Sequence, residues 1–590
     1  ALACASLVAV AAPLALRAAI AARDPAGPAP PVSAVVLDRS DRLLRAFPVA
    51  DGRWRLPVEP ADVDPRFLRM LLGYEDRGFE RHRGVEIRAL ARAGWQLLRH
   101  GRIVSGGSTL TMQVARLLHG EPTRAAGAKL GQVLDALALE RRHSKPEILR
   151  LYLELAPYGG NIEGIRAASL AYFGKEPGRL TPAEAALLVA IPQSPEARRP
   201  DRGAAGLRAA RDRVLARAAS LGILDAEDVA AARAEPVPRL RRAFPMLAAH
   251  VAERVAAEAP PERVHRLTID AGLQRALEDL ARERASALPD RVSVAILAAD
   301  HRTGEILASV GSSDLFDAGR SGFVDMTRAV RSPGSALKPL IYGLAFEQGI
   351  AHPESLVEDR PTAFAGYVPA NFDRNFQGTV TVRRALQLSL NVPAVQLLDA
   401  VGPARLVARM RRAGARPVLS DLSPPGLAIG LGGVGVTLAD LVAIHAAIAR
   451  GGTPAALHVR RKAAPPPPAG RVLDARAAWY VSSILAGMPQ PGRAGGTIAY
   501  KTGTSYGYRD AWSIGYDGRR VIGVWVGRAD GAPVPGLIGI DAAAPILLDA
   551  FARMGPVVPL AGPPPGVLVA SSAGLPGPLR RVRVPRGPAP

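Results

Sequence analysis

The most constraining feature of this chain is a set of three short polar segments that have to meet in the folded state. They are Ser335-Ala336-Leu337-Lys338, Ser389-Leu390-Asn391 and Lys501-Thr502-Gly503-Thr504. Together they supply hydroxyl, amine and amide groups in the order and wide spacing of a serine acyl-transfer site. The sequence therefore predicts a fold that joins distant parts of its second half at one site.

The lysines in these segments stand out because the chain is basic mainly through arginine. Lysine and arginine total 75, and lysine occurs only at Lys129, Lys145, Lys175, Lys338, Lys462 and Lys501. An arginine keeps its proton at any working pH, whereas the pKa of a lysine falls when it is desolvated or lies beside another cation. Of the six lysines, only Lys338 has a serine three residues before it. Lys338 is therefore the predicted base, and Lys501 is expected to help keep it neutral.

The surroundings of Ser335 favour a nucleophile at the start of a helix. Ser335 follows Pro333-Gly334 and precedes an apolar stretch, so we expect it in the first turn, with Lys338 one turn later and in contact with it. Lys338 would take the proton of Ser335, and Ser389 would pass a proton to the leaving amine. The remaining groups suit substrate binding: an amide at Asn391, carboxylate binding by Lys501 and Thr502, and an oxyanion hole from the N–H groups of Thr504 and Ser335.

Residues 511–526 predict a β-hairpin, because two runs of strand-forming residues flank Asp517-Gly518. Residues 501–504 are then expected on a neighbouring strand. A rival hypothesis is that Ser505, in Gly503-Thr504-Ser505-Tyr506-Gly507, is the nucleophile of a G-x-S-x-G elbow. An elbow has to open a helix, whereas a hairpin follows here, so Ser335 is the preferred nucleophile.

The first half of the chain carries a second group of polar residues. A helix that starts at Asp64-Pro65 would place Glu75 near its end, facing a cleft. The Gly-rich stretch 105–108 leads into a helix expected over 109–118, so N–H groups and hydroxyls there can bind an anion, and Arg116 and Lys129 add positive charge. A simple capped helix explains this stretch equally well. No G-x-x-x-x-G-K motif is present, so a nucleotide site is not expected.

On these residues, the first half resembles the family 51 peptidoglycan glycosyltransferases, and residues 62–554 resemble the class A penicillin-binding proteins, most nearly their 1C subtype. The most subtype-like stretches are Leu110-Thr111-Met112-Gln113-Val114-Ala115-Arg116, Ala156-Pro157-Tyr158-Gly159-Gly160 and Ser505-Tyr506-Gly507-Tyr508-Arg509-Asp510-Ala511-Trp512. The resemblance implies that Glu75 is the catalytic carboxylate of glycosyl transfer. It implies pyrophosphate contacts from Ser108, Thr109, Gln113, Arg116 and Lys129. It also gives the transpeptidase roles to Ser335, Lys338, Ser389, Asn391, Lys501, Thr502, Gly503 and Thr504.

One position departs from the family pattern. Three residues after Lys129, where most of these glycosyltransferases carry a second glutamate, this chain has Gln132. An amide can form hydrogen bonds beside the leaving pyrophosphate but supplies no charge. The resemblance admits a divalent cation such as Mg²⁺ at that place for glycosyl transfer, and it implies no cofactor for transpeptidation.

The resemblance implies a multidomain fold. One domain would be mostly α and lysozyme-like, and the other α/β, with an antiparallel sheet and helices. The expected ranges are an N-terminal membrane anchor at 1–23 in which the chain begins, a glycosyltransferase domain at 62–235, a connector at 236–267, a transpeptidase domain at 268–556 and a Pro/Gly-rich extended tail at 557–590.

The charge of the chain suits a partner with anionic groups. Its net charge is +22 and its isoelectric point is near 10.9. The arginines are spread along the chain without an RNA or DNA motif, so we expect an anionic membrane surface and phosphate-bearing lipid, not nucleic acid. With the apolar N-terminal segment, this predicts a single-pass protein of the inner membrane with its catalytic domains in the periplasm. The single cysteine, Cys4, excludes an intramolecular disulfide.

The leading hypothesis is a bifunctional peptidoglycan synthase that polymerises lipid II into nascent glycan, cross-links the stem peptides and is acylated by β-lactams. A pure hydrolase, either a carboxypeptidase or a β-lactamase, is the second hypothesis. The chain has no glutamate after Glu358, so it lacks the residue that class A β-lactamases use to hold the deacylating water. The third hypothesis is a penicillin-binding sensor with a silent glycosyltransferase half, and Gln132 is its only support.

Overall fold

The computed structural model describes residues 14, 17–23, 30–88, 95, 107–119, 126–364, 366–419, 424–462, 466, 469–490 and 496–582. The chain forms two compact units. The first consists of residues 1–35, 45–246 and 259–265, and the second of residues 36–44, 247–258 and 266–590. Ser105 and Gly106 of the predicted anion site, most of the expected anchor and residues 583–590 of the expected tail lie outside the described residues.

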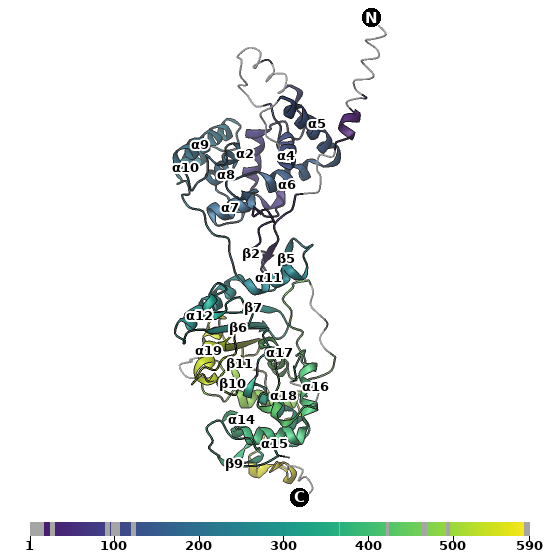
Figure 1. The fold of residues 1–590 in the computed structure, drawn as a ribbon, viewed down its shortest axis with the longest axis vertical. Coiled ribbons are helices and arrows are strands. Elements are labelled where there is room, and N and C mark those ends of the chain that lie inside the picture. The colour runs from purple at the N-terminus through teal and green to yellow at the C-terminus, as the bar shows by residue number, and fades with distance from the viewer. Residues whose placement is uncertain are drawn as a thin grey trace. The chain divides into compact units, whose positions relative to one another are not determined.

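The first unit is mostly helical, as expected (Figure 1). Its helices are α2 (Pro65–Glu75), α4 (Leu110–His119), α5 (Ala126–Arg142), α6 (Lys145–Leu155), α7 (Ile165–Phe173), α8 (Pro182–Ala190), α9 (Ala204–Ser220) and α10 (Ala226–Ala234). Helix α8 is buried almost throughout and packs against α2 and α9, while α4 packs against α5 and α6. Two short strands, β3 (Trp54–Arg55) and β4 (Ile162–Glu163), pair in parallel.

Helix α2 confirms the predicted start at Asp64-Pro65. The Asp64 side chain accepts a hydrogen bond from the backbone N–H of Arg66 at 2.8 Å, and Pro65 occupies the first helical position, where no donor is needed. The helix buries Phe67, Met70 and Leu71 and ends at Glu75. The sequence therefore places this carboxylate correctly at the end of a helix.

The second unit is built around a five-stranded antiparallel sheet in the order β10-β11-β12-β6-β7. The strands are β6 (Val292–Asp300), β7 (Ile306–Val310), β10 (Ala499–Thr504), β11 (Asp510–Tyr516) and β12 (Arg520–Arg528). The predicted hairpin is confirmed, because Tyr516 pairs with Val521 around the turn at Asp517-Gly518. The predicted place of residues 501–504 is confirmed too, since Lys501 pairs with Ile514 on β11.

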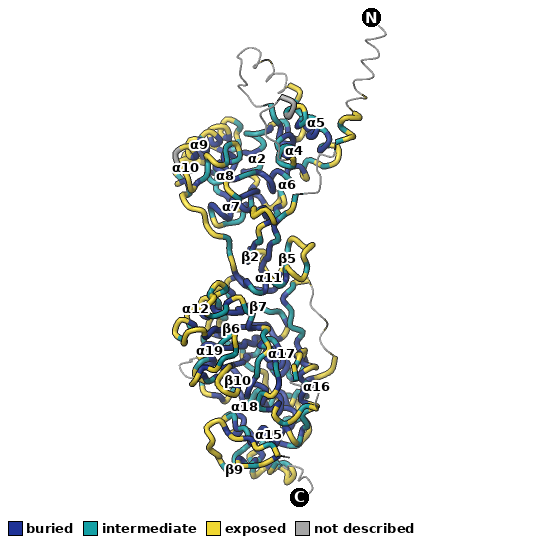
Figure 2. The backbone as a smooth tube through the Cα atoms, in the orientation of Figure 1, coloured by how far each residue is buried: buried dark blue, intermediate teal, exposed yellow. Residues whose placement is uncertain are grey.

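Helices cover both faces of this sheet (Figure 1). The Ser335 face carries α13 (Lys338–Glu347), α15 (Asn391–Val401), α17 (Leu438–Ala449) and α18 (Ala475–Leu485), and the opposite face carries α12 (Ala271–Ser286) and α19 (Ala544–Arg553). Strands β6 and β11 are buried along their whole length (Figure 2, dark blue). Burial on both faces gives the site a rigid floor.

The remaining elements of the second unit frame the site or lie around it. They are α11 (Ala249–Glu258), β8 (Leu356–Asp359), β9 (Gly378–Thr381), α14 (Val382–Gln387) and α16 (Pro403–Arg412). Strands β8 and β9 form an antiparallel pair. Three further strands, β1 (Val35–Leu37), β2 (Leu43–Ala46) and β5 (Val264–Arg266), form a separate sheet in the order β2-β1-β5.

The C-terminal segment differs from the expected extended tail without a core. Its described part, to Val582, forms two short 3₁₀ turns and buries Leu575. Val582 donates a backbone hydrogen bond to Leu356, and Leu356 donates one to Arg580, both at 2.9 Å. These backbone groups of Arg580 and Val582 hold the segment at the edge of β8. Among the described residues no helix has the length and apolar character needed to cross a membrane.

Candidate active sites

Ser335 lies where the chain enters α13. It is part of a 3₁₀ turn, Gly334–Leu337, that continues directly into the helix at Lys338. The carbonyl of Ser332, just upstream, accepts a hydrogen bond from the indole N–H of Trp512 at 2.9 Å, which fixes this segment to β11. The expected helix start at Ser335 is confirmed, with a tighter first turn than an α-helix has.

Two glycines allow β10 to lie against this turn. Gly334 has a φ of +50°, and a Cβ atom there would lie 2.2 Å from the carbonyl oxygen of Thr504. A Cβ at Gly503 would lie 2.6 Å from the carbonyl oxygen of Pro333. Only residues without a side chain permit this approach. The backbone of Thr504 is thereby brought next to Ser335, where the sequence predicted an oxyanion hole.

The amine of Lys338 is fully buried and directed at the second predicted segment. It donates to the carbonyl oxygens of Ser389 at 2.6 Å and Leu390 at 3.1 Å, and to Oδ1 of Asn391 at 2.7 Å. Ser335 and Lys338 form no hydrogen bond with each other in this structure. The amine of Lys338 instead forms hydrogen bonds with the three oxygen atoms of residues 389–391. The 3₁₀ turn also gives Ser335 a position around the helix axis that differs from that in an α-helix.

Lys501 reaches the same place from β10. Its Nζ donates to the hydroxyl of Ser389 at 2.9 Å and to the carbonyl of Thr502 at 2.7 Å. Ser389, with a φ of +58°, has a left-handed backbone conformation that is costly for a residue with a side chain. The structure therefore brings Lys338, Ser389, Asn391 and Lys501 together as the sequence predicted.

The protonation of the two lysines follows from burial and from their proximity. Burial lowers the pKa of Lys338 well below its usual range, and the charge of Lys501 lowers it further, while Asp359 acts in the opposite direction. Burial lowers the pKa of Lys501 to about 7. Because the charge of Lys501 lowers the pKa of Lys338, Lys338 is the lysine of the pair that gives up its proton more readily and is therefore the candidate base.

Two residues that the sequence did not single out complete this site. Asn371 accepts a hydrogen bond from the backbone N–H of Asn391 at 2.8 Å, and its own amide donates to the carboxylate of Asp359 at 2.9 Å. Neither belongs to a short motif that marks a catalytic group. The only sequence signal was the polar stretch 371–375, between β8 and β9.

Ser505, the rival nucleophile, is 3% exposed and serves another purpose. Its hydroxyl donates to Asp510 at 2.9 Å, and the indole N–H of Trp525 donates to the other oxygen of the same carboxylate. No helix follows it. The structure therefore supports the preference for Ser335.

In the first unit, Glu75 is held between two amides. Its Oε2 accepts from Nε2 of Gln113 on α4 at 2.9 Å, and its Oε1 accepts from Nε2 of Gln193 at 2.8 Å. Arg198 donates to the oxygen of Gln193 at 2.9 Å, which fixes the direction of that amide. Gln193 was missed because it lies in a short 3₁₀ turn after α8, with no motif around it.

Two cations lie near this carboxylate. Lys129 on α5 donates to the hydroxyl of Ser108, and burial together with the charge of Arg116 lowers the pKa of Lys129. Within the described part of the chain, neither Arg116 nor Lys129 forms an ion pair with a carboxylate. Two interacting cations without a counter-charge form a place for an anionic ligand.

Thr109 has a structural role in this unit. It is 3% exposed, its hydroxyl accepts from the backbone N–H of Met112 at 3.1 Å, and it donates to the carbonyl of Gly84 at 2.6 Å. The N–H of Leu110 is taken by the carboxylate of Asp76 at 2.8 Å. The hydroxyl of Thr109 thus has the structural role that the alternative of a capped helix gave it, while Ser108, Arg116 and Lys129 remain candidates for binding an anion.

Gln132 is 7% exposed on α5, one turn after Lys129. Its Nε2 is buried and has no hydrogen-bond partner among the described residues. A buried donor without a partner carries a free-energy penalty unless a ligand or water satisfies it. Gln132 thus offers an N–H group beside the two cations.

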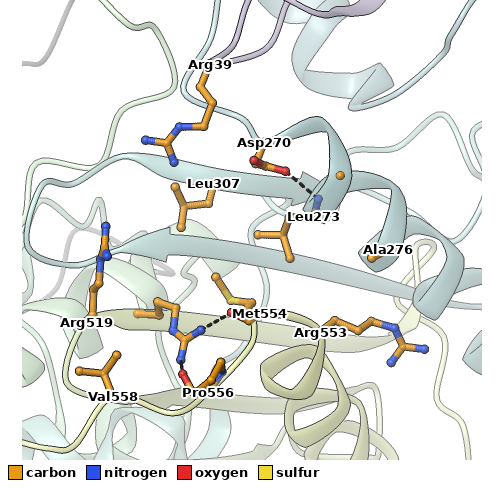
Figure 3. A pocket seen from close by; sticks show the side chains of 12 residues that line it. Arg39, Asp270, Leu273, Ala276, Leu307, Arg519, Arg553, Met554, Pro556 and Val558 are labelled. Atoms are coloured by element: carbon orange, nitrogen blue, oxygen red, sulfur yellow. Dashed lines mark hydrogen bonds between the residues drawn. The ribbon is translucent and has the colours of Figure 1, made fainter.

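A pocket of about 510 Å³ lies elsewhere in the second unit, at the face of the sheet covered by α12 and α19 (Figure 3). Leu273, Ala276 and Leu307 give it apolar lining. Two of the arginines that line it form ion pairs, Arg39 with Glu305 at 3.0 Å and Arg519 with Asp300 at 2.7 Å. No residue of the Ser335 site lines it. The pocket therefore takes no part in acyl transfer.

Comparisons with known proteins identify the family of each half of the chain. Residues 41–219 match the Transglycosylase family, and residues 294–535 match the family described as Penicillin binding protein transpeptidase domain. The chain is 45% identical over 520 residues to penicillin-binding protein 1C of Escherichia coli, covering 87% of this chain and 67% of that protein. It is 30% identical over 515 residues to penicillin-binding protein 1B of Vibrio cholerae, covering 78% of this chain and 64% of that protein.

The fold has a solved counterpart in penicillin-binding protein 1A from Haemophilus influenzae. The TM-score is 0.53 at 17% identity, with 90% of this chain and 94% of that chain covered. At this identity the likeness supports the arrangement of elements within the fold and not the roles of individual residues.

Proposed function

We infer that the chain, which belongs to the class A penicillin-binding proteins, is a bifunctional peptidoglycan synthase with glycosyltransferase and D-Ala-D-Ala transpeptidase activities. We propose that the two reactions are carried out by the two groups of residues described above, with lipid II and the stem peptides of the glycan as substrates. The observation that carries the transpeptidase assignment is the meeting of two buried lysines at Ser389, next to the turn that bears Ser335.

In transpeptidation, Lys338 takes the proton of Ser335 as its oxygen attacks the D-Ala-D-Ala carbonyl. The resulting ammonium is stabilised by the three oxygen acceptors of residues 389–391, which favour the charged amine more than the neutral one. The proton then reaches the leaving amine through Ser389, which lies between Lys338 and Lys501. Attack by an acceptor amine on the acyl-enzyme releases the cross-linked peptide and regenerates Ser335.

The neighbouring groups bind the substrate. Thr502 and the protonated Lys501 bind the terminal carboxylate, and the N–H groups of Ser335 and Thr504 stabilise the oxyanion. The Asn391 amide, which donates to the carbonyl of Ala370, has a second N–H that can bind a substrate amide. A β-lactam presents the same carbonyl and carboxylate and therefore acylates Ser335.

In glycosyl transfer, Glu75 removes the proton from the acceptor sugar hydroxyl. The alkoxide attacks the anomeric carbon of the donor, and lipid pyrophosphate leaves with inversion. Gln113 and Gln193 fix both carboxylate oxygens of Glu75. Arg116 and Lys129 neutralise the pyrophosphate, and the unpartnered Nε2 of Gln132 donates to it.

The charge of the leaving pyrophosphate can be neutralised by cations of the chain itself. Among the described residues no three histidine, cysteine or acidic side chains come together to hold a metal ion. Asp135, the nearest carboxylate along α5, is paired with Arg23 at 2.6 Å, and position 132 supplies an amide. Mg²⁺ prefers carboxylate and phosphate oxygens, so we assign charge neutralisation in this chain to Arg116 and Lys129.

Residues near the chain start support a membrane-bound donor. Arg23 ties the short N-terminal helical segment to α5, the helix that carries Lys129 and Gln132, through Asp135. Ile87 and Leu130 are 79% and 64% exposed in the same unit. Exposed apolar side chains beside a basic cleft suit a membrane face that presents a lipid pyrophosphate. We place the protein in the inner membrane, anchored by its N-terminal segment, with both catalytic units on the periplasmic side.

The assay that tests this function is polymerisation of lipid II by detergent-solubilised protein, with and without penicillin. We expect glycan in both samples and cross-links only without the drug. A chain that hydrolyses penicillin and forms no polymer would support the hydrolase alternative. A chain that is acylated by penicillin and forms no polymer would support the sensor.

A further inference from the structure

A buried carboxylate lies behind the acyl-transfer site, two side chains away from its base. Asp359 ends β8 and is completely buried. Its two oxygens accept hydrogen bonds from the amide of Asn371, at 2.9 Å each, and one of them also accepts from the backbone N–H of Gln377 at 2.8 Å. Within the described part of the chain it forms no ion pair. A buried carboxylate whose hydrogen-bond donors are all neutral carries a desolvation penalty in free energy. Its retention at this position suggests a function for its negative charge.

The carboxylate sets the orientation of the Asn371 amide, and the carbonyl of Ala370, the residue before Asn371, sets that of the Asn391 amide. Because a carboxylate only accepts, Asn371 has to present its NH₂ group to Asp359, which leaves its oxygen to accept from the backbone N–H of Asn391 at 2.8 Å. The NH₂ group of Asn391 donates to the carbonyl of Ala370 at 2.7 Å. The oxygen of Asn391 is therefore the atom that faces Lys338, at 2.7 Å.

We propose that Asp359 and Asn371 are positioning residues of the transpeptidase: they hold in place the backbone of Asn391 and of Ala370, whose carbonyl directs the Asn391 amide, so that the Asn391 oxygen receives the protonated Lys338, and the Asp359 charge stabilises the ammonium formed when Ser335 is deprotonated. The proposal rests on Ser335 and Lys338 acting as nucleophile and base. Neither positioning residue touches the substrate. Their contribution is largest in the transition state, where Lys338 gains a positive charge that burial and Lys501 otherwise oppose.

The other groups near Lys338 do not replace this charge. Burial, together with the charge of Asp359, raises the pKa of Tyr342 on α13. Burial lowers the pKa of His445 on α17 to about 4. Both are therefore neutral near pH 7. The charged residues of α14, α15, α16 and α18 lie in part or fully at the surface, and they are Arg383, Arg384, Asp399, Arg405, Arg409, Arg411, Arg412 and Arg476. Lys501 and Asp359 are thus the two charges that act on Lys338.

The chain offers a matched control for the charge of Asp359. Glu358, the preceding residue on β8, has a side chain that is 40% exposed and lies next to Arg360, Thr379 and Arg581 at the surface. Glu358→Gln removes one negative charge from the same strand without touching the chain of amides. Water screens the electrostatic effect of the Glu358 charge on the pKa of Lys338, whereas the effect of the buried Asp359 charge is not screened in this way.

The experiment is the second-order rate of acylation of the full chain by a fluorescent penicillin, measured from pH 4 to pH 9. Acylation needs neutral Lys338, so the rate rises as the pH passes the pKa of this lysine. Loss of the Asp359 charge lowers that pKa. In Asp359→Asn we therefore expect the rise of the acylation rate with pH, the acidic limb of the pH profile, to move to lower pH by about 1 unit, and the plateau rate to fall about tenfold. Glu358→Gln should leave both unchanged.

A double variant keeps the test decisive if Asp359→Asn folds poorly. Asp359→Asn with Asn371→Asp exchanges the amide and the carboxylate, so the hydrogen bonds to Gln377 and Asn391 can still form and the charge moves closer to Lys338. We expect its acidic limb at or above the parental pH. The proposal would be overturned if the acylation rate of Asp359→Asn rose at the same pH as that of the parent, whatever its plateau rate. It would also be overturned if the rate of the double variant rose at a lower pH than that of the parent. Labelling of Ser335→Ala would instead contradict the assignment of the nucleophile.

Discussion

Lys501 donates a hydrogen bond to the hydroxyl of Ser389 at 2.9 Å, and Ser389 is also the residue whose carbonyl accepts from Lys338. One residue thus links the two lysines of the site, although they lie on different elements, β10 and α13. Two ammonium groups repel each other in a buried place, so the state in which both lysines are protonated is disfavoured and the two lysines lose their protons at different pH values. This relationship sets the expected pH dependence and the identity of the base.

Acylation should depend on Ser335 and not on Ser505. Ser335→Ala removes the nucleophile and should abolish labelling by a fluorescent penicillin. Ser505→Ala removes a buried hydrogen bond to Asp510, which costs about 1 kcal/mol of stability, and should leave the labelling of folded protein intact. Gel fluorescence after brief incubation reads out both variants. Persistent labelling of the Ser335 variant would show that another serine is acylated.

The acylation rate should also fall at alkaline pH. The pKa of Lys501 is about 7, and its protonated form binds the substrate carboxylate, so this charge is present below pH 7 and is lost as the pH rises through the pKa. Arginine stays protonated at these pH values. Lys501→Arg should therefore be slower than the parent by about tenfold or more and lack the alkaline limb. An unchanged alkaline limb in this variant would assign that limb to another group.

Glycosyl transfer should depend on the two amides that hold Glu75. Glu75→Gln should abolish polymerisation of lipid II, because the base is gone. Gln193→Ala removes the hydrogen bond to Oε1 and should slow polymerisation about tenfold by leaving the carboxylate less well oriented. Gln193→Ala should leave penicillin labelling at the parental level, because Ser335 lies in the other unit. Parental polymerisation in the Glu75 variant would mean that a different group is the base.

Position 132 should determine how the glycosyltransferase responds to metal ions. With Arg116 and Lys129 available and an amide at Gln132, we expect measurable polymerisation with weak dependence on Mg²⁺. Gln132→Glu adds a charge that repels the donor and can bind a cation, so its rate should depend more strongly on Mg²⁺. Titration of Mg²⁺ against the polymerisation rate compares the two proteins. Identical metal dependence would contradict the charge argument.

The features that the sequence predicted well depend on local or repeated patterns. The hairpin at 511–526 follows from strand-forming residues on both sides of Asp517-Gly518, and the start of α2 follows from Asp64-Pro65. Ser335, Lys338, Ser389, Asn391 and Lys501 were found because their motifs have a fixed order. Such features can be recognised from the sequence without knowledge of the tertiary structure.

The features that the sequence did not reveal depend on contacts between distant segments. Gln193 and Asn371 become meaningful only through their hydrogen bonds to Glu75 and Asn391, and an isolated amide in a loop gives no signal. The absence of a hydrogen bond between Ser335 and Lys338 has the same origin. Helical spacing places the two side chains on one face, but acceptors at 389–391 compete for the amine.

The most direct test of the account is analysis of the glycan made from lipid II by the parent, Ser335→Ala and Glu75→Gln proteins. Digestion with a muramidase and chromatography of the muropeptides separates cross-linked from single units. We predict cross-linked glycan from the parent, glycan with only uncross-linked units from the Ser335 variant and no glycan from the Glu75 variant. Cross-linked muropeptides from the Ser335 variant, or polymer from the Glu75 variant at the parental rate, would contradict the assignment of two separate sites.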